Sequence, residues 1–389
     1  MSGRDWPWAM LDEVATVTAG NPAPQRTEFF DGGSRPFVRV QDLGRLNGAS
    51  HLTKTAGLVN DRAAATLKLF PRGSVLFTKS GASLLLNQRA ILGRDMHVVS
   101  HIGVAVPGPR ITSEWLYYWL RTVDFADIAH GANMPSLPLA RVKRLRVPVP
   151  PVPDQQRRVA EIEKQLSRLD EAVASLKRAK LNIEHYERST IEALTSPSSF
   201  SIKVVGTVSD VAESLDNMRE PVNKTERAKR VGTIPYLGAN GRTGWIDEAR
   251  FDEELVLVVE DETFVGRKLP FSYYFSGKCW VNNHTHVLRA RRDLVLPKYL
   301  NLALSYYPFI PLTTGSTGRR KLTKAALMSA PIKMPTLEVQ RRIVSEVDRR
   351  LSILRQVEAD VDANLERAQA LWQAVLATAF CNGREVIGH

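Results

Sequence analysis

Two features are scarce in this sequence: cysteine and long apolar runs. Among 389 residues only Cys279 and Cys381 carry a thiol, and their spacing fits neither a disulfide framework nor a zinc-binding motif. No apolar stretch is long enough to cross a lipid bilayer, and residues 1–17 lack the basic start and apolar core of a signal peptide. We therefore expect a protein of the reducing cytoplasm with no membrane partner.

Positive charge, in contrast, is abundant. The chain has 53 lysines and arginines against 41 aspartates and glutamates, which gives a net charge of +12. Such an excess favours a polyanionic partner, with nucleic acid ahead of a membrane surface. The alternative is a soluble basic protein without such a partner. The length suits two domains rather than one, and 43% hydrophobic residues suffice for packed cores.

One short pattern occurs twice. Gln156-Arg157-Arg158-Val159 matches Gln340-Arg341-Arg342-Ile343 at an offset of 184 residues (340 − 156 = 184). The same offset places Pro151 on Pro335, Gly131 on Gly315, and "EWLYYWL" on "KYLNLAL". These matches predict a duplicated unit, each copy a globular part followed by a long helix. The alternative is chance similarity between two amphipathic helices.

Both predicted helices have apolar residues at alternating steps of three and four, which is typical of a coiled-coil seam. The expected seam consists of Val159, Ile162, Leu166, Leu169, Val173, Leu176, Lys180 and Ile183 in the first helix, and of Val347, Leu351, Leu354, Glu358, Val361, Leu365 and Trp372 in the second. A helix of this kind must bury its apolar stripe, and each helix is the obvious partner of the other. A duplicated unit that pairs with itself favours an antiparallel arrangement.

Matching the ends of the two antiparallel helices places Leu166 beside Trp372 and Lys180 beside Glu358. A lysine and a glutamate facing each other would fix the register; the alternative is that both extend into solvent. We predict an α+β fold with a globular domain at residues 1–150, a long helix at 151–196, a second globular domain at 197–335 and a second long helix at 336–383. The two globular parts read as mixed and strand-rich, since apolar runs such as "SVLFTK" and "ELVLVVE" are separated by turn sequences.

Polar and basic loops lie between the predicted strands. Arginine and lysine suit guanine edges and phosphates, while asparagine and glutamine suit adenine edges in the major groove. Ordinary solvated loops are the alternative. The candidate DNA-binding residues are Lys79, Asn87, Gln88, Arg89, Asn133, Asn240, Arg242, Thr243, Asn282, Asn283, His284, Arg319, Arg320 and Lys321.

No catalytic or metal site is expected in this chain. His284 and His286 would face the same way on a strand, but no cysteine or carboxylate partner is obvious from the sequence. "EDETFVGRK" lacks the Glu-x-Lys spacing of restriction nucleases, and "VPPVP" lacks the acidic or amide residue and the aromatic of amino-methyltransferases. No glycine-rich phosphate loop of the P-loop type occurs. The chain therefore reads as a recognition protein without catalysis of its own.

Several of these stretches carry a resemblance. "FVRVQDL" and "GSVLFTKSG" in the first half, "IPYLGANGRTGWI", "WVNNHTHVL" and "GSTGRRKLTKAAL" in the second, and the two helix starts after Pro151 and Pro335 resemble the specificity subunit of type I restriction–modification systems. Nearly the whole chain is covered. The first half departs from the pattern, because "AHGANMPSLPLARV" lacks the basic cluster at Arg319–Lys321.

The resemblance implies that each globular half is a target recognition domain, which reads one part of a split site in double-stranded DNA, and that the two long helices form a spacer. It also implies two modification (methyltransferase) subunits as partners, which bring S-adenosylmethionine as their own cofactor, and restriction (motor-nuclease) subunits. This chain itself would hold no cofactor. The alternatives are a coiled-coil protein-binding scaffold without specific DNA readout, a self-sufficient methyltransferase or nuclease, and a transcription factor.

Overall fold

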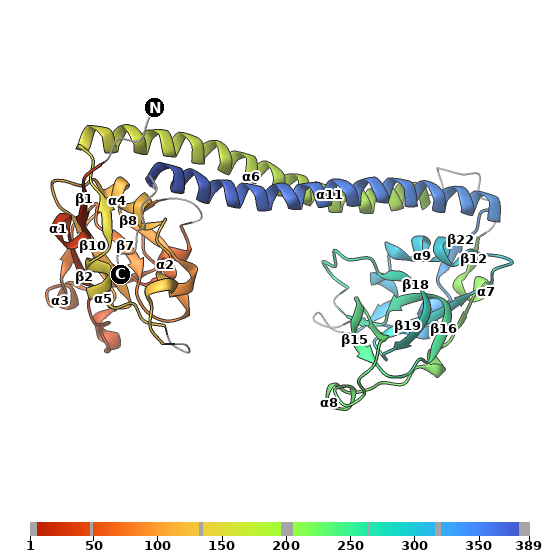
Figure 1. Ribbon diagram of the computed structural model, residues 1–389. Coiled ribbons are helices and arrows are strands. Elements are labelled where there is room, and N and C mark those ends of the chain that lie inside the picture. The colour runs from red at the N-terminus through yellow and green to blue at the C-terminus, as the bar shows by residue number, and fades with distance from the viewer. Residues whose placement is uncertain are drawn as a thin grey trace. The chain divides into compact units, whose positions relative to one another are not determined.

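The structure is a computed structural model, which describes residues 6–46, 50–131, 135–195, 205–262, 264–315 and 320–380 (Figure 1). The chain divides into two compact units: unit 1 contains Met1–Leu176 and Ala363–His389, and unit 2 contains Lys177–Asp362. The division falls inside both long helices rather than at their ends. Each unit therefore consists of one globular part and portions of both helices. No helix in the described ranges has the length and hydropathy that a bilayer crossing requires.

The globular part of unit 1 is built from short strands and short helices. Its strands are β1 (Trp8–Met10), β2 (Ala15–Ala19), β3 (Arg35–Val38), β4 (His51–Leu52), β5 (Gly57–Val59), β6 (Leu69–Phe70), β7 (Val75–Thr78), β8 (Arg89–Leu92), β9 (Met96–Val98), β10 (Ile102–Pro107) and β11 (Arg146–Pro148). Its helices are α1 (Leu11–Val14), η1 (Thr27–Phe29), α2 (Val40–Gly44), α3 (Asp61–Ala64), η2 (Ala82–Leu86), α4 (Ser113–Leu120), η3 (Phe125–Ile128) and α5 (Leu139–Lys143). The sheets have the orders β2-β10-β7-β8-β4, β5-β3-β9-β6 and β1-β11.

The core of unit 1 is centred on the aromatic helix α4. The Thr112 side chain caps this helix by accepting a hydrogen bond from the Trp115 amide at 3.2 Å. The Trp115 and Trp119 side chains are fully buried. The Trp115 indole donates to the Pro148 carbonyl at 2.8 Å, and its ring packs against Phe380 with centroids 4.5 Å apart. One tryptophan thus joins α4, β11 and the end of the last helix.

Unit 2 repeats this plan with longer strands. Its strands are β12 (Val205–Thr207), β13 (Ala212–Ser214), β14 (Ile234–Gly238), β15 (Gly241–Ile246), β16 (Phe251–Val259), β17 (Asp261–Glu262), β18 (Ser272–Val281), β19 (Thr285–Ala290), β20 (Thr313–Thr314), β21 (Arg320–Leu322) and β22 (Pro331–Lys333). Its helices are α7 (Val208–Val211), η5 (Asp216–Met218), α8 (Lys224–Arg227), α9 (Pro297–Ser305), η6 (Ile310–Leu312) and α10 (Lys324–Met328). The sheets have the orders β13-β19-β16-β18-β14-β15, β17-β21-β20 and β12-β22.

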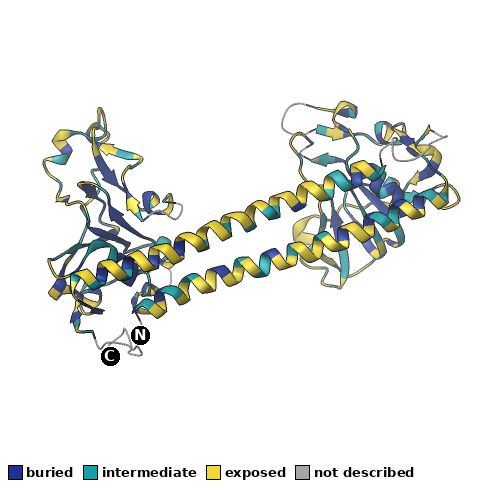
Figure 2. Ribbon diagram, turned by 90° about the horizontal axis from the view of Figure 1, so that it is seen from above, coloured by how far each residue is buried: buried dark blue, intermediate teal, exposed yellow. Residues whose placement is uncertain are grey.

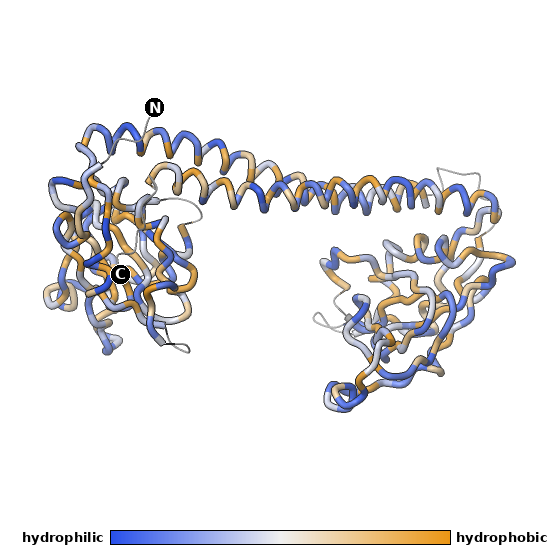
Figure 3. Tube along the Cα trace, in the orientation of Figure 1, coloured by the Kyte–Doolittle hydropathy of each residue, from blue (hydrophilic) through white to orange (hydrophobic). Residues whose placement is uncertain are grey.

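The duplication seen in the sequence is confirmed by the two strand orders. The run β2-β10-β7 in unit 1 corresponds to β13-β19-β16 in unit 2, and the antiparallel pair β1-β11 corresponds to β12-β22. The "EWLYYWL" and "KYLNLAL" stretches form α4 and α9, each packed against its own sheet. Figure 3 shows apolar strands inside each globular part, whereas the long helices are largely hydrophilic.

The two long helices, α6 (Val152–Thr195) and α11 (Leu337–Phe380), each have 44 residues. In unit 1 the beginning of α6 shares a core with the end of α11, where Val159 and Ile162 lie in one cluster with Leu376. In unit 2 the end of α6 shares a core with the beginning of α11, where Ile191 clusters with Val347. The predicted antiparallel pairing is therefore confirmed within each unit.

Every predicted seam residue is buried or half-buried, but the burial is uneven along the helices (Figure 2). Between Leu166 and Ile183 no α6 side chain is fully buried. Lys180 lies in this stretch, and its ammonium is 4.0 Å from Glu358, as the matched ends predicted. The closer partner is Asp362, at 2.6 Å, and this hydrogen bond raises the pKa of Lys180. The heptad pattern did not predict Asp362, because Asp362 follows the seam residue Val361 and is not a seam position itself.

A buried glutamine fixes the first turn of each long helix. Gln155 is fully buried; its amide accepts from the Thr112 backbone at 2.9 Å and donates to the carbonyls of Arg110 and Pro150 at 2.9 and 2.7 Å. Gln340 is fully buried and makes the same three bonds, from Leu296 and to Leu294 and Pro335, at 2.8, 3.0 and 2.9 Å.

These bonds correct the sequence alignment. Gln155, not Gln156, is the counterpart of Gln340, so the structural offset at the helix start is 185 residues (340 − 155 = 185). Thr112 and Leu296 make equivalent bonds at an offset of 184 residues (296 − 112 = 184), so the one-residue shift between the two copies lies before the helices. A pattern match cannot separate two adjacent glutamines, because only their burial differs.

We predict that Gln155→Ala and Gln340→Ala each lower the free energy of unfolding by about 1–3 kcal/mol, because buried backbone groups lose their partners. Chemical denaturation of the purified chain measures the change. Gln156→Ala, at the neighbouring exposed position, is the matched control and should have little effect. Equal stability of Gln155→Ala and Gln156→Ala would contradict the assigned role.

Candidate nucleic-acid interface

The candidate loops of unit 2 converge because of the order of its strands. β14 pairs in parallel with β18, so the turn between β14 and β15 lies beside the turn that follows β18. The backbone amide of Asn282 donates to the Leu237 carbonyl at 3.0 Å, which joins the two turns. Arg267 reaches the same turn and donates to Asn240 Oδ1 at 2.8 Å. The predicted residues Asn240 and Asn282 are thus brought together, and Asn283 is exposed next to them.

A small three-stranded sheet adds the basic residues. β17 pairs with β21 so that Asp261 faces Lys321, and β21 pairs with β20. His284 joins this sheet to the preceding turn, since its Nδ1 lies 2.6 Å from Asp261 Oδ1. Lys321 is exposed but forms a 2.9 Å ion pair with Glu260, and Arg320 donates to Thr313 Oγ1 at 2.7 Å. A DNA contact by either side chain would have to compete with these bonds.

The β15 strand carries the remaining candidates of unit 2. Arg242 and Thr243 are exposed on it. The Arg242 guanidinium lies 4.4 Å from the centre of the Trp245 ring, and the Trp245 side chain is 47% exposed. An arginine stacked on an exposed aromatic suits contact with phosphates or unstacked bases.

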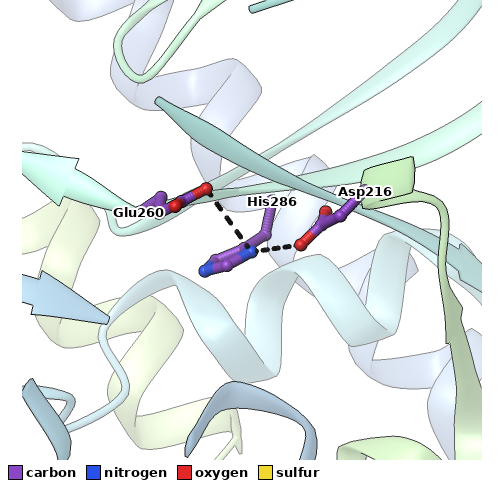
Figure 4. Close-up of side chains that lie close together, drawn as sticks. All are labelled: Asp216, Glu260 and His286. Atoms are coloured by element: carbon purple, nitrogen blue, oxygen red, sulfur yellow. Dashed lines mark hydrogen bonds and ion pairs between the residues drawn. The ribbon is translucent and has the colours of Figure 1, made fainter. Parts of the chain in front are cut away.

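Behind this surface lies a buried cluster of Asp216, Glu260 and His286 (Figure 4). His286 Nδ1 is 2.6 Å from Asp216 and 3.8 Å from Glu260, and its Nε2 is 2.8 Å from the Leu322 carbonyl. Sequence analysis found no carboxylate partner for His286, because Asp216 is 70 residues away along the chain. The cluster ties η5, β19 and β21 together and so positions the strand that bears Lys321.

Both carboxylates of this cluster have cationic partners. Glu260 also accepts a hydrogen bond from Arg219 and is paired with Lys321. Burial raises the pKa of Asp216, but the hydrogen bond to His286 and the nearby cations outweigh it, so the pKa lies below its usual value. The pKa of Glu260 is likewise lowered, since bonds from Arg219 and Lys321 outweigh the effect of burial.

The ligand atoms of the three side chains lie within 4.8 Å of one another, as in a metal site, but their hydrogen bonds and ion pairs do not favour a metal ion. Both ring nitrogens of His286 face oxygen atoms that only accept hydrogen bonds, so the ring fits best with hydrogen on both. A metal would have to displace that hydrogen and the cations at Glu260. We assign the cluster a structural role and place no metal in it.

The candidates of unit 1 are placed less favourably. Lys79, Asn87 and Gln88 are half-buried. The side-chain amide of Asn87 donates to the Val123 carbonyl at 3.1 Å. Arg89 is only 5% exposed, and its guanidinium lies 3.9 Å from the centre of the Phe125 ring. Burial, followed by the charge of Arg121, lowers the pKa of Arg89 to about 9. Burial therefore removes Arg89 from the candidate interface, because its donors are enclosed by its own unit. Asn133 and Arg319 lie outside the described residues.

The sequence analysis also missed a basic surface on and after α8. Lys224 and Lys229 are exposed there, and the Arg227 guanidinium lies 4.4 Å from the centre of the Tyr236 ring. Four cations within residues 224–230 were the available signal. This cluster lies on and after a short helix, whereas the predicted DNA-binding residues lie in loops between strands.

We predict that acid weakens unit 2 through the buried cluster. A carboxylate with a lowered folded pKa contributes stability above its unfolded pKa of about 4, and the contribution is lost as the pH falls through the folded value. The double variant Asp216→Asn/Glu260→Gln should be less stable at pH 7 and should lose less stability than the wild type on acidification. Thermal unfolding at pH 7, 5 and 3 measures both effects, with the exposed Asp252→Asn as control. Parallel losses in wild type and double variant would refute the role of the cluster.

Known proteins resemble this chain in sequence and in fold. Residues 3–185 and 203–366 match the family model of the type I restriction modification DNA specificity domain. A type I restriction enzyme specificity subunit of Haemophilus influenzae is 36% identical over 139 residues, which is 36% of this chain and 35% of that protein. The matched segment thus spans about a third of that relative's length. The StySPI specificity subunit of Salmonella potsdam is 19% identical over 96% of this chain and 88% of its own length.

Two solved structures show the same fold. One, from a type I R-M system, has a TM-score of 0.75 at 18% identity and covers 97% of this chain and 98% of its own. The other, the HsdS subunit of Thermoanaerobacter tengcongensis, has a TM-score of 0.58 at 18% identity with 97% coverage of both chains. Because the family model matches each unit in turn and most of the chain, this protein belongs to the type I restriction modification DNA specificity domain family.

Proposed function

We propose that this chain is the DNA-specificity subunit of a type I restriction–modification complex and reads a bipartite site, one part with each globular region. The observation that carries the proposal is one fold that occurs twice in the chain, with each copy matched by the family model of a DNA specificity domain. The net charge of +12 supports a polyanionic ligand. The two copies carry different side chains at their loops, so they would read different bases.

The long helices would serve as the spacer between the two reading regions. α6 and α11 both run from one unit into the other, and they are paired antiparallel within each unit. Two linked binding regions act as one bivalent ligand, whose affinity depends on whether both can be engaged at once. A fixed spacer would therefore select sites with a fixed number of unread base pairs, as the symmetry of dimeric repressors selects half-site spacing.

Protein partners would dock on surfaces that suit protein better than DNA. In unit 2 the helices expose the large apolar side chains of Leu181, Tyr186 and Ile353, at 60%, 60% and 53%. In unit 1 an open groove of about 1100 Å³ between α4 and the helices is lined by aromatic and acidic residues, among them Trp372 and Glu163. Acidic groups repel phosphates, so these surfaces favour modification subunits, which would bring S-adenosylmethionine, and restriction subunits.

Mapping of methylated adenines tests the proposal. The chain is co-expressed with its modification subunit in a host without other adenine methylation, and the genome is sequenced with a method that detects N6-methyladenine. We expect one two-part motif with a constant gap. Methylation without a two-part motif, or binding of purified chain to DNA without sequence preference and without steep salt dependence, would instead favour a protein-binding scaffold.

Shortening both helices together tests the spacer. Removal of residues 170–176 and 363–369 deletes one heptad from each helix and keeps Lys180 beside Asp362. Each helix becomes shorter by about 10 Å, at about 1.5 Å per residue, which corresponds to about three base pairs. We expect loss of methylation at the native motif or a gap changed by about three base pairs. An unchanged gap in a folded variant would rule out a spacer role. Alanine at Ser175, Glu366 and Arg367, which are exposed positions of the same heptads outside the groove, is the control of equal length.

A further inference from the structure

The two units share one histidine-bearing loop arrangement that the sequence alignment did not reveal. In unit 1 the Lys79 amide donates to the His101 carbonyl at 2.9 Å, and the Lys79 carbonyl accepts from Leu137 at 2.8 Å. In unit 2 the Glu260 amide donates to the His284 carbonyl at 3.0 Å, and the Glu260 carbonyl accepts from Leu322 at 2.8 Å. The equal bonding pattern makes His101 and His284 structural counterparts.

The side chains of these histidines are also held alike. His101 Nδ1 lies 2.7 Å from Ser80 Oγ, and His284 Nδ1 lies 2.6 Å from Asp261 Oδ1. Ser80 pairs with Ser136 just as Asp261 pairs with Lys321, so each anchoring residue comes from the same position of the fold. Sequence spacing hides the equivalence, because the offsets differ: 101 to 284 is 183 residues, whereas 80 to 261 is 181.

Each histidine presents its other ring nitrogen outward. His101 is exposed, and the His284 side chain is 41% exposed. Within the described residues, no hydrogen bond occupies Nε2 of either ring. An imidazole that is fixed through Nδ1 and open at Nε2 has one directed hydrogen-bonding atom to offer a ligand. In unit 2 this atom lies in the surface that also bears Asn282, Asn283 and Lys321.

We propose that His101 and His284 are equivalent base-reading residues, one for each part of the DNA site. This inference rests on the proposed function and adds a residue pair to it. Asp261 only accepts, so Nδ1 of His284 carries hydrogen; the tautomer with hydrogen on Nδ1 alone leaves Nε2 as an acceptor, which fits the amino group of adenine or cytosine in the major groove. The Ser80 hydroxyl can donate or accept, so His101 can also expose Nε2–H to the acceptors of guanine or adenine.

The test uses His101→Ala and His284→Ala, each co-expressed with the modification subunit, with methylated motifs mapped as for the wild type. We expect each variant to relax one or more bases in only one part of the motif, and the two variants to affect opposite parts. Discrimination at the affected base should fall about tenfold or more. His185→Ala, at an exposed histidine of α6 outside this arrangement, is the control and should leave both parts unchanged.

Each outcome has a distinct meaning. A two-part wild-type motif that is unchanged in both variants overturns the histidine assignment and leaves the proposed function standing, whereas absence of a two-part motif in the wild type overturns the function. A uniform loss of binding on all sequences assigns the histidines to phosphate and also overturns base reading.

A third variant keeps the test decisive if the alanine variants are too unstable to fold. Asp261→Ser gives His284 the anchoring group of His101 and should change the preferred base in one part of the motif while methylation persists. If the motif of this folded variant is unchanged, the orienting role of Asp261 is refuted.

Discussion

The burial of helix ends in aromatic and aliphatic cores is the constraint on which the rest of the structure depends. α6 and α11 are polar over most of their surface, and a helix of this composition gains little from its own hydrogen bonds in water. Their apolar residues are concentrated where they can pack on a globular part: Val159 and Phe380 in unit 1, Ile191 and Ile343 in unit 2. Neither helix could be removed from a unit without exposing the core of that unit.

The same scaffold is filled by different chemistry in the two units. His286 in unit 2 occupies the position of Gly103 in unit 1, two residues after the paired histidines. A Cβ at Gly103 would lie 2.1 Å from the Phe77 ring, so unit 1 fills this space with an aromatic side chain where unit 2 has a histidine and carboxylates. A buried ionic cluster is a weaker source of stability than apolar packing, but it holds its members in one arrangement. In unit 2 that arrangement includes the strand next to the candidate DNA surface.

Much of the fold could be predicted from the sequence, because periodicity and duplication are visible as patterns. The heptad spacing predicted both long helices. Matching the helix ends placed Lys180 beside Glu358, and its closer partner, Asp362, lies about one helical turn further along the same helix. The contact residues were harder to predict. Arg89 was chosen for its charge, yet burial decides its role, and burial depends on where Phe125 packs. The partners of His286 and the equivalence of His101 with His284 depend on strand pairing between distant segments, which no local pattern reports.

The fully buried Gln155 and Gln340 have a mechanical consequence. Each glutamine bonds its helix to the globular part that precedes it, so the direction of the helix is set within its first turn. With 44 residues, each helix is about 66 Å long, at about 1.5 Å per residue. Such a helix acts as a lever arm: a tilt of about 5° at its anchored turn would displace the far end by about 6 Å, nearly the rise of two base pairs. Under the proposed function, the hold of these two amide side chains on the helix starts would contribute to how precisely the gap in the DNA site is selected.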